Sequence, residues 1–122
     1  MDRVPLVKIG EVLLVALQMD IGDRLTSTLR DDIARAIIDQ GCRCVLIDIS
    51  ALEIVDTFMC RTIAVMAKMF GVLDAETVVV GMRPAVAITL IELGMNLQGV
   101  RTALTVEQGL AILGHRVQSA AR

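Results

Sequence analysis

The feature that most constrains this chain is an apolar run from Cys44 to Ile49 that scarcely alternates between apolar and polar residues. A strand with this pattern is typical of a parallel sheet that is covered on both faces. The flanking segments supply the cover. Apolar residues recur at helical spacing between Asp23 and Gln40, and a second helix, capped by Asp56, is predicted to run to about Phe70.

Turn and cap residues predict the other boundaries. Gly10 and Glu11 are typical of a hairpin turn, and Pro84 suits the first turn of a helix. Helices are expected to end at Gly41, Gly71 and Gly94, and Thr105 to cap the last one. The predicted strands cover residues 6–9, 12–17, 44–49, 77–80 and 100–103, and the predicted helices cover 23–40, 56–70, 85–93 and 106–117.

The element order predicts the fold class. Strands and helices alternate after an opening hairpin, so we expect one α/β domain over residues 1–122. Its sheet should be mixed and largely parallel, with about five strands and four to five helices. No transmembrane segment is predicted, because the apolar run from Val12 to Leu17 is far shorter than the roughly 20 residues that a bilayer requires. Residues 1–5 lack the charged-then-apolar pattern of a signal peptide, and no sensor domain is expected.

Composition argues against several kinds of partner. The net charge is −2, and the chain has no Trp or Tyr, so neither a basic surface nor aromatic stacking platforms for nucleic acid are expected. The hydrophobic fraction of 55% must be buried in the sheet or in contacts with other subunits. We therefore expect a cytoplasmic protein that self-associates and has no nucleic-acid or membrane partner.

Cofactor and metal sites are not predicted. The chain has a single histidine, His115, and lacks the glycine motifs of dinucleotide and P-loop sites. The odd number of cysteines favours a reducing compartment. Cys42 and Cys44 are expected to be small apolar residues on one face of a buried strand, rather than a metal or redox pair, and Cys60 is the third cysteine.

Three carboxylates, those of Asp48, Glu53 and Asp56, lie in one strand–loop–helix segment. They could converge for acid/base work, but capping or solvated carboxylates are the favoured interpretation, and no enzyme activity is expected. Thr57 follows Asp56 at the helix start, where free N–H groups and the helix dipole suit a phosphate on its hydroxyl. By spacing alone, however, Asp-Thr at a helix start is usually a cap followed by the first helical residue.

Three segments resemble a known family. Residues 45–57, Val-Leu-Ile-Asp-Ile-Ser-Ala-Leu-Glu-Ile-Val-Asp-Thr, resemble the central strand and phosphoacceptor loop of STAS domains, the SpoIIAA-like fold of anti-anti-sigma factors. Residues 81–94, Gly-Met-Arg-Pro-Ala-Val-Ala-Ile-Thr-Leu-Ile-Glu-Leu-Gly, resemble the stressosome branch of that family, as do residues 102–113. The resemblance spans nearly the whole chain.

The resemblance implies a function. The chain starts shortly before its first predicted strand, so it is similar to the antagonist (RsbS-type) subunits, which are bare STAS domains, rather than to sensory (RsbR-type) subunits. Such an antagonist is a non-enzymatic scaffold that assembles with RsbR-type subunits. It sequesters a serine/threonine switch kinase (RsbT-type) and releases it when phosphorylated. A phosphatase (RsbX-type) is a further expected partner, and no cofactor is implied.

The resemblance also implies the site residues. Thr57 is the principal phosphoacceptor and Asp56 positions it. Helical spacing alone, apart from the resemblance, allows Arg61, one turn later, to give the phosphate a charged partner or to point elsewhere. Antagonists usually have Asp-Ser here, whereas Asp-Thr is the pair of the sensory subunits. Thr89 matches a second phosphosite of sensory subunits, or is a packed residue of an apolar helix. A stand-alone anti-anti-sigma factor that binds an anti-sigma kinase, and a small ligand-binding module, stay open as alternatives.

Overall fold

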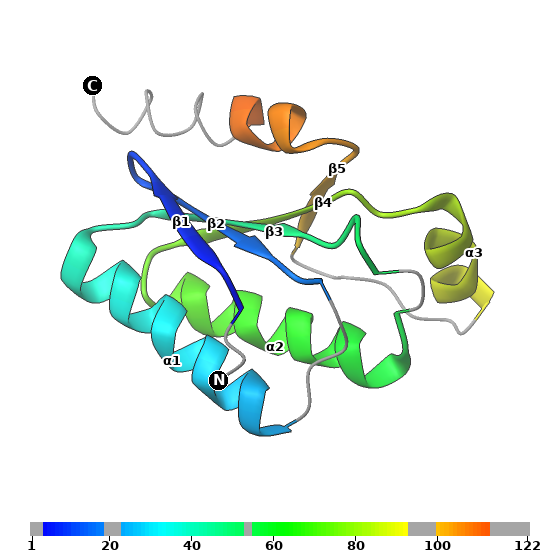
Figure 1. Ribbon diagram of the computed structural model, residues 1–122, viewed down its shortest axis with the longest axis horizontal. Helices are drawn as coiled ribbons and strands as arrows, with labels where there is room; N and C mark the ends of the chain where they lie inside the picture. The colour runs from blue at the N-terminus through cyan, green and yellow to red at the C-terminus, as the bar shows by residue number, and fades with distance from the viewer. Residues whose placement is uncertain (1–3, 19–22, 53–54, 93–99, 113–122) are drawn as a thin grey trace.

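The computed structural model describes residues 4–18, 23–52, 55–92 and 100–112, which form a five-stranded sheet with helices on both faces (Figure 1). The predicted α/β class and the order of the elements are confirmed. The strands are β1 (Leu6–Ile9), β2 (Val12–Ala16), β3 (Cys44–Asp48), β4 (Glu76–Val80) and β5 (Arg101–Ala103). The helices are α1 (Asp23–Gln40), α2 (Thr57–Val72) and α3 (Pro84–Glu92), and residues 106–112 are also helical.

The sheet is mixed, as predicted, with the strand order β1-β2-β3-β4-β5. Only β1 and β2 are antiparallel, and the three other pairings are parallel. In the central strand β3, Leu46 pairs with Leu14 of β2 and with Val78 of β4. Because parallel neighbours end at the same edge, the segments that follow β3 and β4 leave the sheet side by side.

The two faces of the sheet carry cores of different size. α1 and α2 cover one face, where Ile33 and Phe70 are fully buried (Figure 1). The opposite face carries a smaller core around Leu46 and Val80, which the helix at residues 106–112 covers. A Cβ atom on Gly109 would lie 2.5 Å from Leu46 Cδ1 and 2.7 Å from Val80 Cγ1. Glycine therefore lets this helix pack its backbone against the sheet.

Most predicted boundaries agree with the structure to within one or two residues. α1 ends at Gln40, immediately before Gly41, and α3 begins at Pro84. The predicted cap of the last helix is confirmed, because the N–H of Gln108 donates to Thr105 Oγ1 at 3.1 Å. The expected stop at Gly94 lies outside the described residues, as does the predicted part of the last helix after residue 112.

The predicted end of α2 at Gly71 is wrong. The helix continues to Val72, and the left-handed residue that terminates it is Asp74, with φ of 66°. The N–H of Asp74 donates to the carbonyl of Gly71 at 3.0 Å, and the N–H of Ala75 donates to that of Phe70 at 2.9 Å. This is the Schellman arrangement, and aspartate is among the few non-glycine residues that adopt the left-handed conformation.

All three cysteines are buried, as expected for small apolar residues, but Cys42 and Cys44 do not share a face. Cys42 precedes β3 and lies in the core beneath α1 and α2, whereas Cys44 lies in the core on the opposite face. Burial raises the pKa of the Cys42 and Cys60 thiols, which keeps both protonated at neutral pH. Within the described ranges, no three His, Cys, Asp or Glu side chains are grouped to hold a metal ion, and no helix is long and apolar enough to cross a bilayer.

Candidate functional site

The loop at residues 49–56 leads from the central strand to the start of α2. Asp48 ends β3, and its Oδ1 accepts a hydrogen bond of 2.9 Å from the backbone N–H of Ser50, which turns the chain. Further along, Leu52 and Val55 are buried in the core beneath α1 and α2. Leu52 and Val55 are therefore attached to the core, so the position of Asp56 is set by packing of its neighbour as well as by the helix that follows.

Asp56 is the N-cap of α2, as predicted. Its backbone is extended, with φ of −89° and ψ of 178°, and its Oδ1 accepts a hydrogen bond of 2.8 Å from the N–H of Met59. Thr57 is the first residue of the helix and is half-buried, whereas Asp56 is exposed. The first turn of a helix carries partial positive charge on its free N–H groups. A hydroxyl side chain therefore lies at the positive end of α2.

The carboxylates of this segment are used in turns and caps. Asp48 and Asp56 each accept a hydrogen bond from a backbone N–H close to them in sequence. The favoured interpretation, in which they are structural carboxylates, is confirmed for these two residues. Glu53 and His115 both lie outside the described residues.

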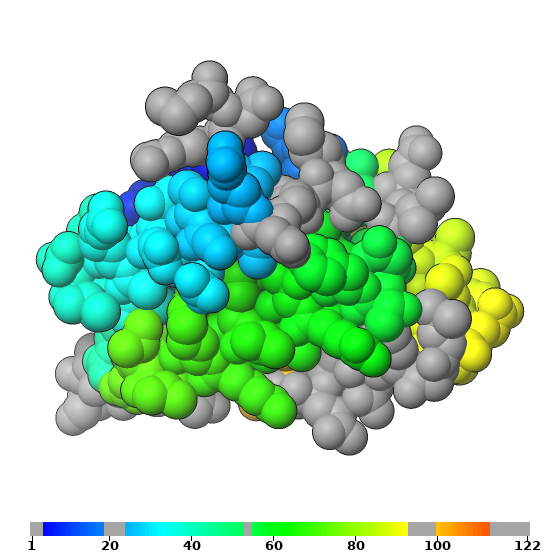
Figure 2. All heavy atoms as spheres, turned by 90° about the horizontal axis from the view of Figure 1, so that it is seen from below, coloured from blue at the N-terminus to red at the C-terminus, as the bar shows by residue number. Residues whose placement is uncertain are grey.

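Arg61 lies on the exposed side of α2, one turn after Thr57. It lines a groove of about 440 Å³ between α1 and α2, together with Arg30 of α1 and Phe58, which is 45% exposed. Figure 2 shows this side of the molecule, where α1 (cyan) and α2 (green) lie next to each other. The surface that begins at Thr57 thus combines positive charge with an exposed aromatic ring.

Thr89 lies on α3, well separated in sequence from the 49–56 loop. Its side chain is exposed, so the alternative that it is a packed residue is wrong. Its Oγ1 donates a hydrogen bond of 2.9 Å to the carbonyl of Ala85, one turn earlier in the same helix. The hydroxyl is reachable from solvent but is already engaged with the backbone.

Two residues that shape the site, Gly81 and Arg83, lie in the turn between β4 and α3 and were not predicted as site residues. Gly81 has φ of 78°, and a Cβ atom on it would lie 2.7 Å from Ser50 Cβ and 2.8 Å from Asp48 Oδ1. Arg83 Nε donates a hydrogen bond of 3.1 Å to the carbonyl of Ser50. The turn after β4 therefore packs directly on the turn after β3. The Gly-Met-Arg-Pro motif marks a turn, but it does not reveal a contact across 33 residues.

Most of the chain matches a known domain family. The model of the STAS domain matches residues 3–109. Among curated proteins, the RsbT co-antagonist protein RsbRA of Bacillus subtilis is 25% identical over 107 residues, which cover 87% of this chain and 39% of RsbRA. This chain therefore spans well under half the length of that relative.

Two solved structures are similar over nearly the whole chain. RsbS of Moorella thermoacetica is 33% identical, with a TM-score of 0.80, and the match covers 96% of this chain and 99% of that chain. A chain in a structure of the stressosome, described as a signal integration and transduction hub, is also 33% identical, with a TM-score of 0.78 and coverage of 93% and 98%. The sheet order, the capped start of α2 and these matches agree: the chain belongs to the STAS domain family.

Proposed function

We propose that this chain is a scaffold and antagonist subunit of a stressosome, which holds an RsbT-type serine/threonine switch kinase and releases it when Thr57 is phosphorylated. The likeness to RsbS and to a stressosome chain over more than nine-tenths of the sequence supports the assembly role. The observation that carries the phosphorylation step is the position of Thr57, which is partly exposed at the first turn of α2 beside the capping carboxylate of Asp56.

The kinase would transfer the γ-phosphoryl group of ATP to the Thr57 hydroxyl, leaving ADP, while the hydroxyl proton leaves for solvent or a base of the kinase. The product carries about −1.5 to −2 additional charge. The start of α2 can stabilise this charge by up to about 1 kcal/mol, so the domain stays folded. Repulsion from Asp56 and the new charge on the surface near Phe58 then weaken the contact with the kinase.

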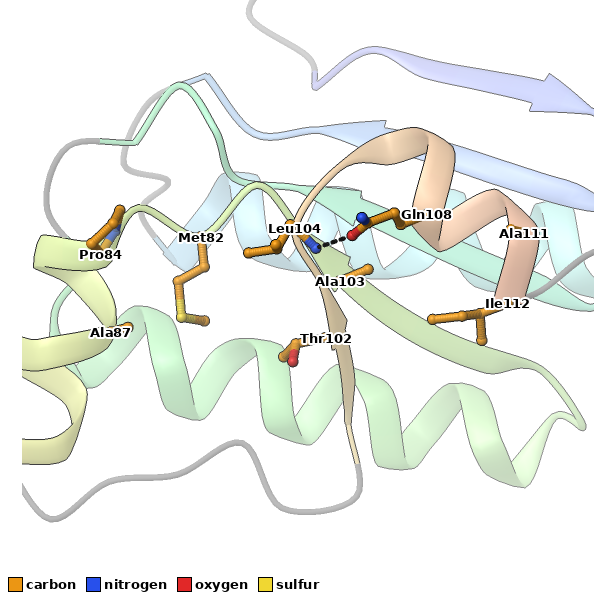
Figure 3. Close-up of a pocket in the computed structure, with 9 residues that line it drawn as sticks. All are labelled: Met82, Pro84, Ala87, Thr102, Ala103, Leu104, Gln108, Ala111 and Ile112. Carbon is orange, nitrogen blue, oxygen red and sulfur yellow. Dashed lines mark hydrogen bonds between the residues drawn. The ribbon is translucent and has the colours of Figure 1, made fainter.

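Apolar surface at the far edge of the sheet supports assembly with RsbR-type subunits and further copies of the chain. β5 is the last strand of the sheet, and Leu104 beside it is 74% exposed. A groove of about 610 Å³ runs between α3, β5 and the helix at residues 106–112, with Met82, Leu104 and Ile112 around it (Figure 3). Apolar surfaces of this kind mark contacts between proteins. In this scheme the protein works in the cytoplasm, and an RsbX-type phosphatase removes the phosphate.

Reconstitution tests the proposal. The purified chain is mixed with RsbR-type subunits and an RsbT-type kinase, sedimented before and after addition of ATP, and analysed by mass spectrometry. We expect a high-mass complex that contains the kinase, phosphate on Thr57 after ATP, and kinase in the free fraction. Thr57→Ala should retain the kinase. A monomer of 13.2 kDa under all conditions would contradict the scaffold role. A small complex with a kinase alone would instead indicate a stand-alone anti-anti-sigma factor, and saturable nucleotide binding would indicate a ligand module.

A further inference from the structure

Arg83 connects the 49–56 loop to α3. Its side chain donates to the Ser50 carbonyl at 3.1 Å, and its own carbonyl accepts hydrogen bonds of 3.0 Å from the N–H groups of Val86 and Ala87 in the first turn of α3. The backbone of Arg83 is thereby fixed by the helix that it precedes. A charged donor that is anchored in this way imposes a direction on the carbonyl that it binds.

The first half of the 49–56 loop depends on this contact more than the second half does. Ser50 and Ala51 are exposed, whereas Leu52 and Val55 are buried in the core. Apart from the Asp48 turn and the backbone bonds of Ile49, the side chain of Arg83 supplies the connection that holds Ser50 to the rest of the domain. The two strand-end turns also meet closely at Gly81, so the loop has a matching surface to rest on.

We expect loss of this hydrogen bond to leave global folding intact. Arg83 and Ser50 are both exposed, and exposed polar contacts add little to the free energy of unfolding. Among the described residues, the Ser50 carbonyl is the hydrogen-bond partner of the Arg83 side chain. The effect of the contact is local order at residues 49–52, which follow β3.

We propose that Arg83 is a positioning residue for phosphorylation of Thr57, because it holds residues 49–52, the described part of the loop that follows β3, in the conformation that the kinase binds. The inference rests on the proposed function, in which Thr57 is the phosphoacceptor. A loop that is ordered before docking loses less conformational entropy when the kinase binds it. Loss of Arg83 therefore weakens recognition of the protein substrate and leaves the transfer step itself unchanged.

Hydrogen exchange of the protein alone tests the structural part. Arg83→Met removes the donor and keeps most of the side-chain length. We expect faster exchange at the amides of residues 49–52, unchanged exchange in α1, and a melting temperature close to that of the parent chain. Arg83→Lys retains a donor and should exchange more slowly than Arg83→Met. Arg35→Met, which replaces an exposed arginine of α1 in the same way, should leave the loop unaffected.

Steady-state phosphorylation by an RsbT-type kinase tests the positioning role. For Arg83→Met we expect a KM for the protein substrate at least about fivefold higher, with kcat within about twofold of the parent value. The KM of Arg83→Lys should lie between that of the parent chain and that of Arg83→Met. Unaltered loop exchange, or an unaltered KM with a loosened loop, would overturn the inference while phosphorylation of the parent chain still supported the proposed function. A parent chain that takes no phosphate on Thr57 would overturn both.

Discussion

Thr57 and Thr89 lie in opposite electrostatic environments, although both are hydroxyl residues of helices. Thr57 is the first residue of the 16-residue helix α2, next to its capping aspartate, and is half-buried. Thr89 lies in the second half of the nine-residue helix α3, is exposed, and donates its hydroxyl proton to Ala85. Accessibility to a kinase favours phosphorylation of Thr89. The helix dipole, in contrast, favours negative charge on Thr57 and disfavours it on Thr89.

Exposure of a hydroxyl therefore does not by itself identify a phosphorylation site. A phosphate on Thr89 would replace the hydroxyl proton and so remove the hydrogen bond to the Ala85 carbonyl. Among the described residues, the Thr57 hydroxyl has no such hydrogen bond to lose, and it lies where free N–H groups begin a helix. The environment that can hold the product is the one at α2.

The largest expected difference is in phosphate incorporation. Thr57→Ala should lower it at least about tenfold, whereas Thr89→Ala should change it by less than about twofold. Mass spectrometry after incubation with an RsbT-type kinase and ATP measures both. Phosphate on Thr89 or Ser50 with Thr57 unmodified would contradict the assignment of Thr57 as the phosphoacceptor. Asp56 and Thr57 would then be only the cap and the first residue of α2.

A substitution at Gly81 should show how strongly the loop that precedes Thr57 depends on its contact with the turn after β4. Gly81→Ala places a Cβ atom against Ser50 and Asp48 at a left-handed φ, and should lower the free energy of unfolding by about 1–3 kcal/mol. Gly71→Ala is the matched control. It lies inside α2 with nothing within 4 Å of the added carbon, so it should raise stability by about 0.5–1 kcal/mol. Urea denaturation measures both, and equal effects would show that the close approach at Gly81 is unimportant.

Removal of the cap should have a smaller effect. Asp56→Ala leaves the N–H of Met59 without its partner, and should destabilise the domain by about 1 kcal/mol, whereas Asp56→Asn retains the acceptor and should cost less. Thr89→Ala loses only an exposed hydroxyl bond, so its effect should stay within about 0.5 kcal/mol. Thermal unfolding at a fixed pH compares the three variants. Equal losses for Asp56→Ala and Thr89→Ala would remove the structural distinction between the two helix regions.

The smallest expected effect tests the dipole directly. Thr57→Glu should be more stable than Thr57→Gln by about 0.3–1 kcal/mol, and Thr89→Glu should be no more stable than Thr89→Gln. The neutral glutamine variants remove the contribution of side-chain size. Both differences should shrink in 1 M salt, where the Debye length is about 3 Å. A salt-independent difference at Thr57 would point to a specific contact instead of the helix end.

Local signals account for what the sequence predicted correctly. Asp56 as a cap, Pro84 at the start of α3 and the doubly buried strand β3 each depend on neighbouring residues, which a sequence displays. The errors arose where another residue could fill the same role. Asp74 adopts the left-handed turn that was assigned to Gly71, because aspartate tolerates that conformation. In the same way, the spacing of Cys42 and Cys44 implied one face only if the strand had already begun at Cys42.

Contacts across the sheet edge were beyond local signals. The strand order brings the ends of β3 and β4 together, but the approach of Gly81 to Ser50 depends on a turn conformation that no pattern encodes. The resemblance to STAS domains identified the 49–56 loop and the Gly-Met-Arg-Pro turn as separate motifs. Their contact became apparent only in three dimensions, through the hydrogen bond from Arg83 to Ser50.

That contact determines which pieces of this domain can be exchanged. The loop before α2 and the turn before α3 are shaped against each other at Gly81, so a chimaera that imports residues 49–57 alone joins a foreign loop to a turn fitted to Ser50. Importing residues 81–84 with them transfers both halves of the contact. In recombination between STAS domains, and in any redesign of kinase specificity, the two turns at this sheet edge should therefore be exchanged together. They form one structural unit, although they lie more than thirty residues apart in the chain.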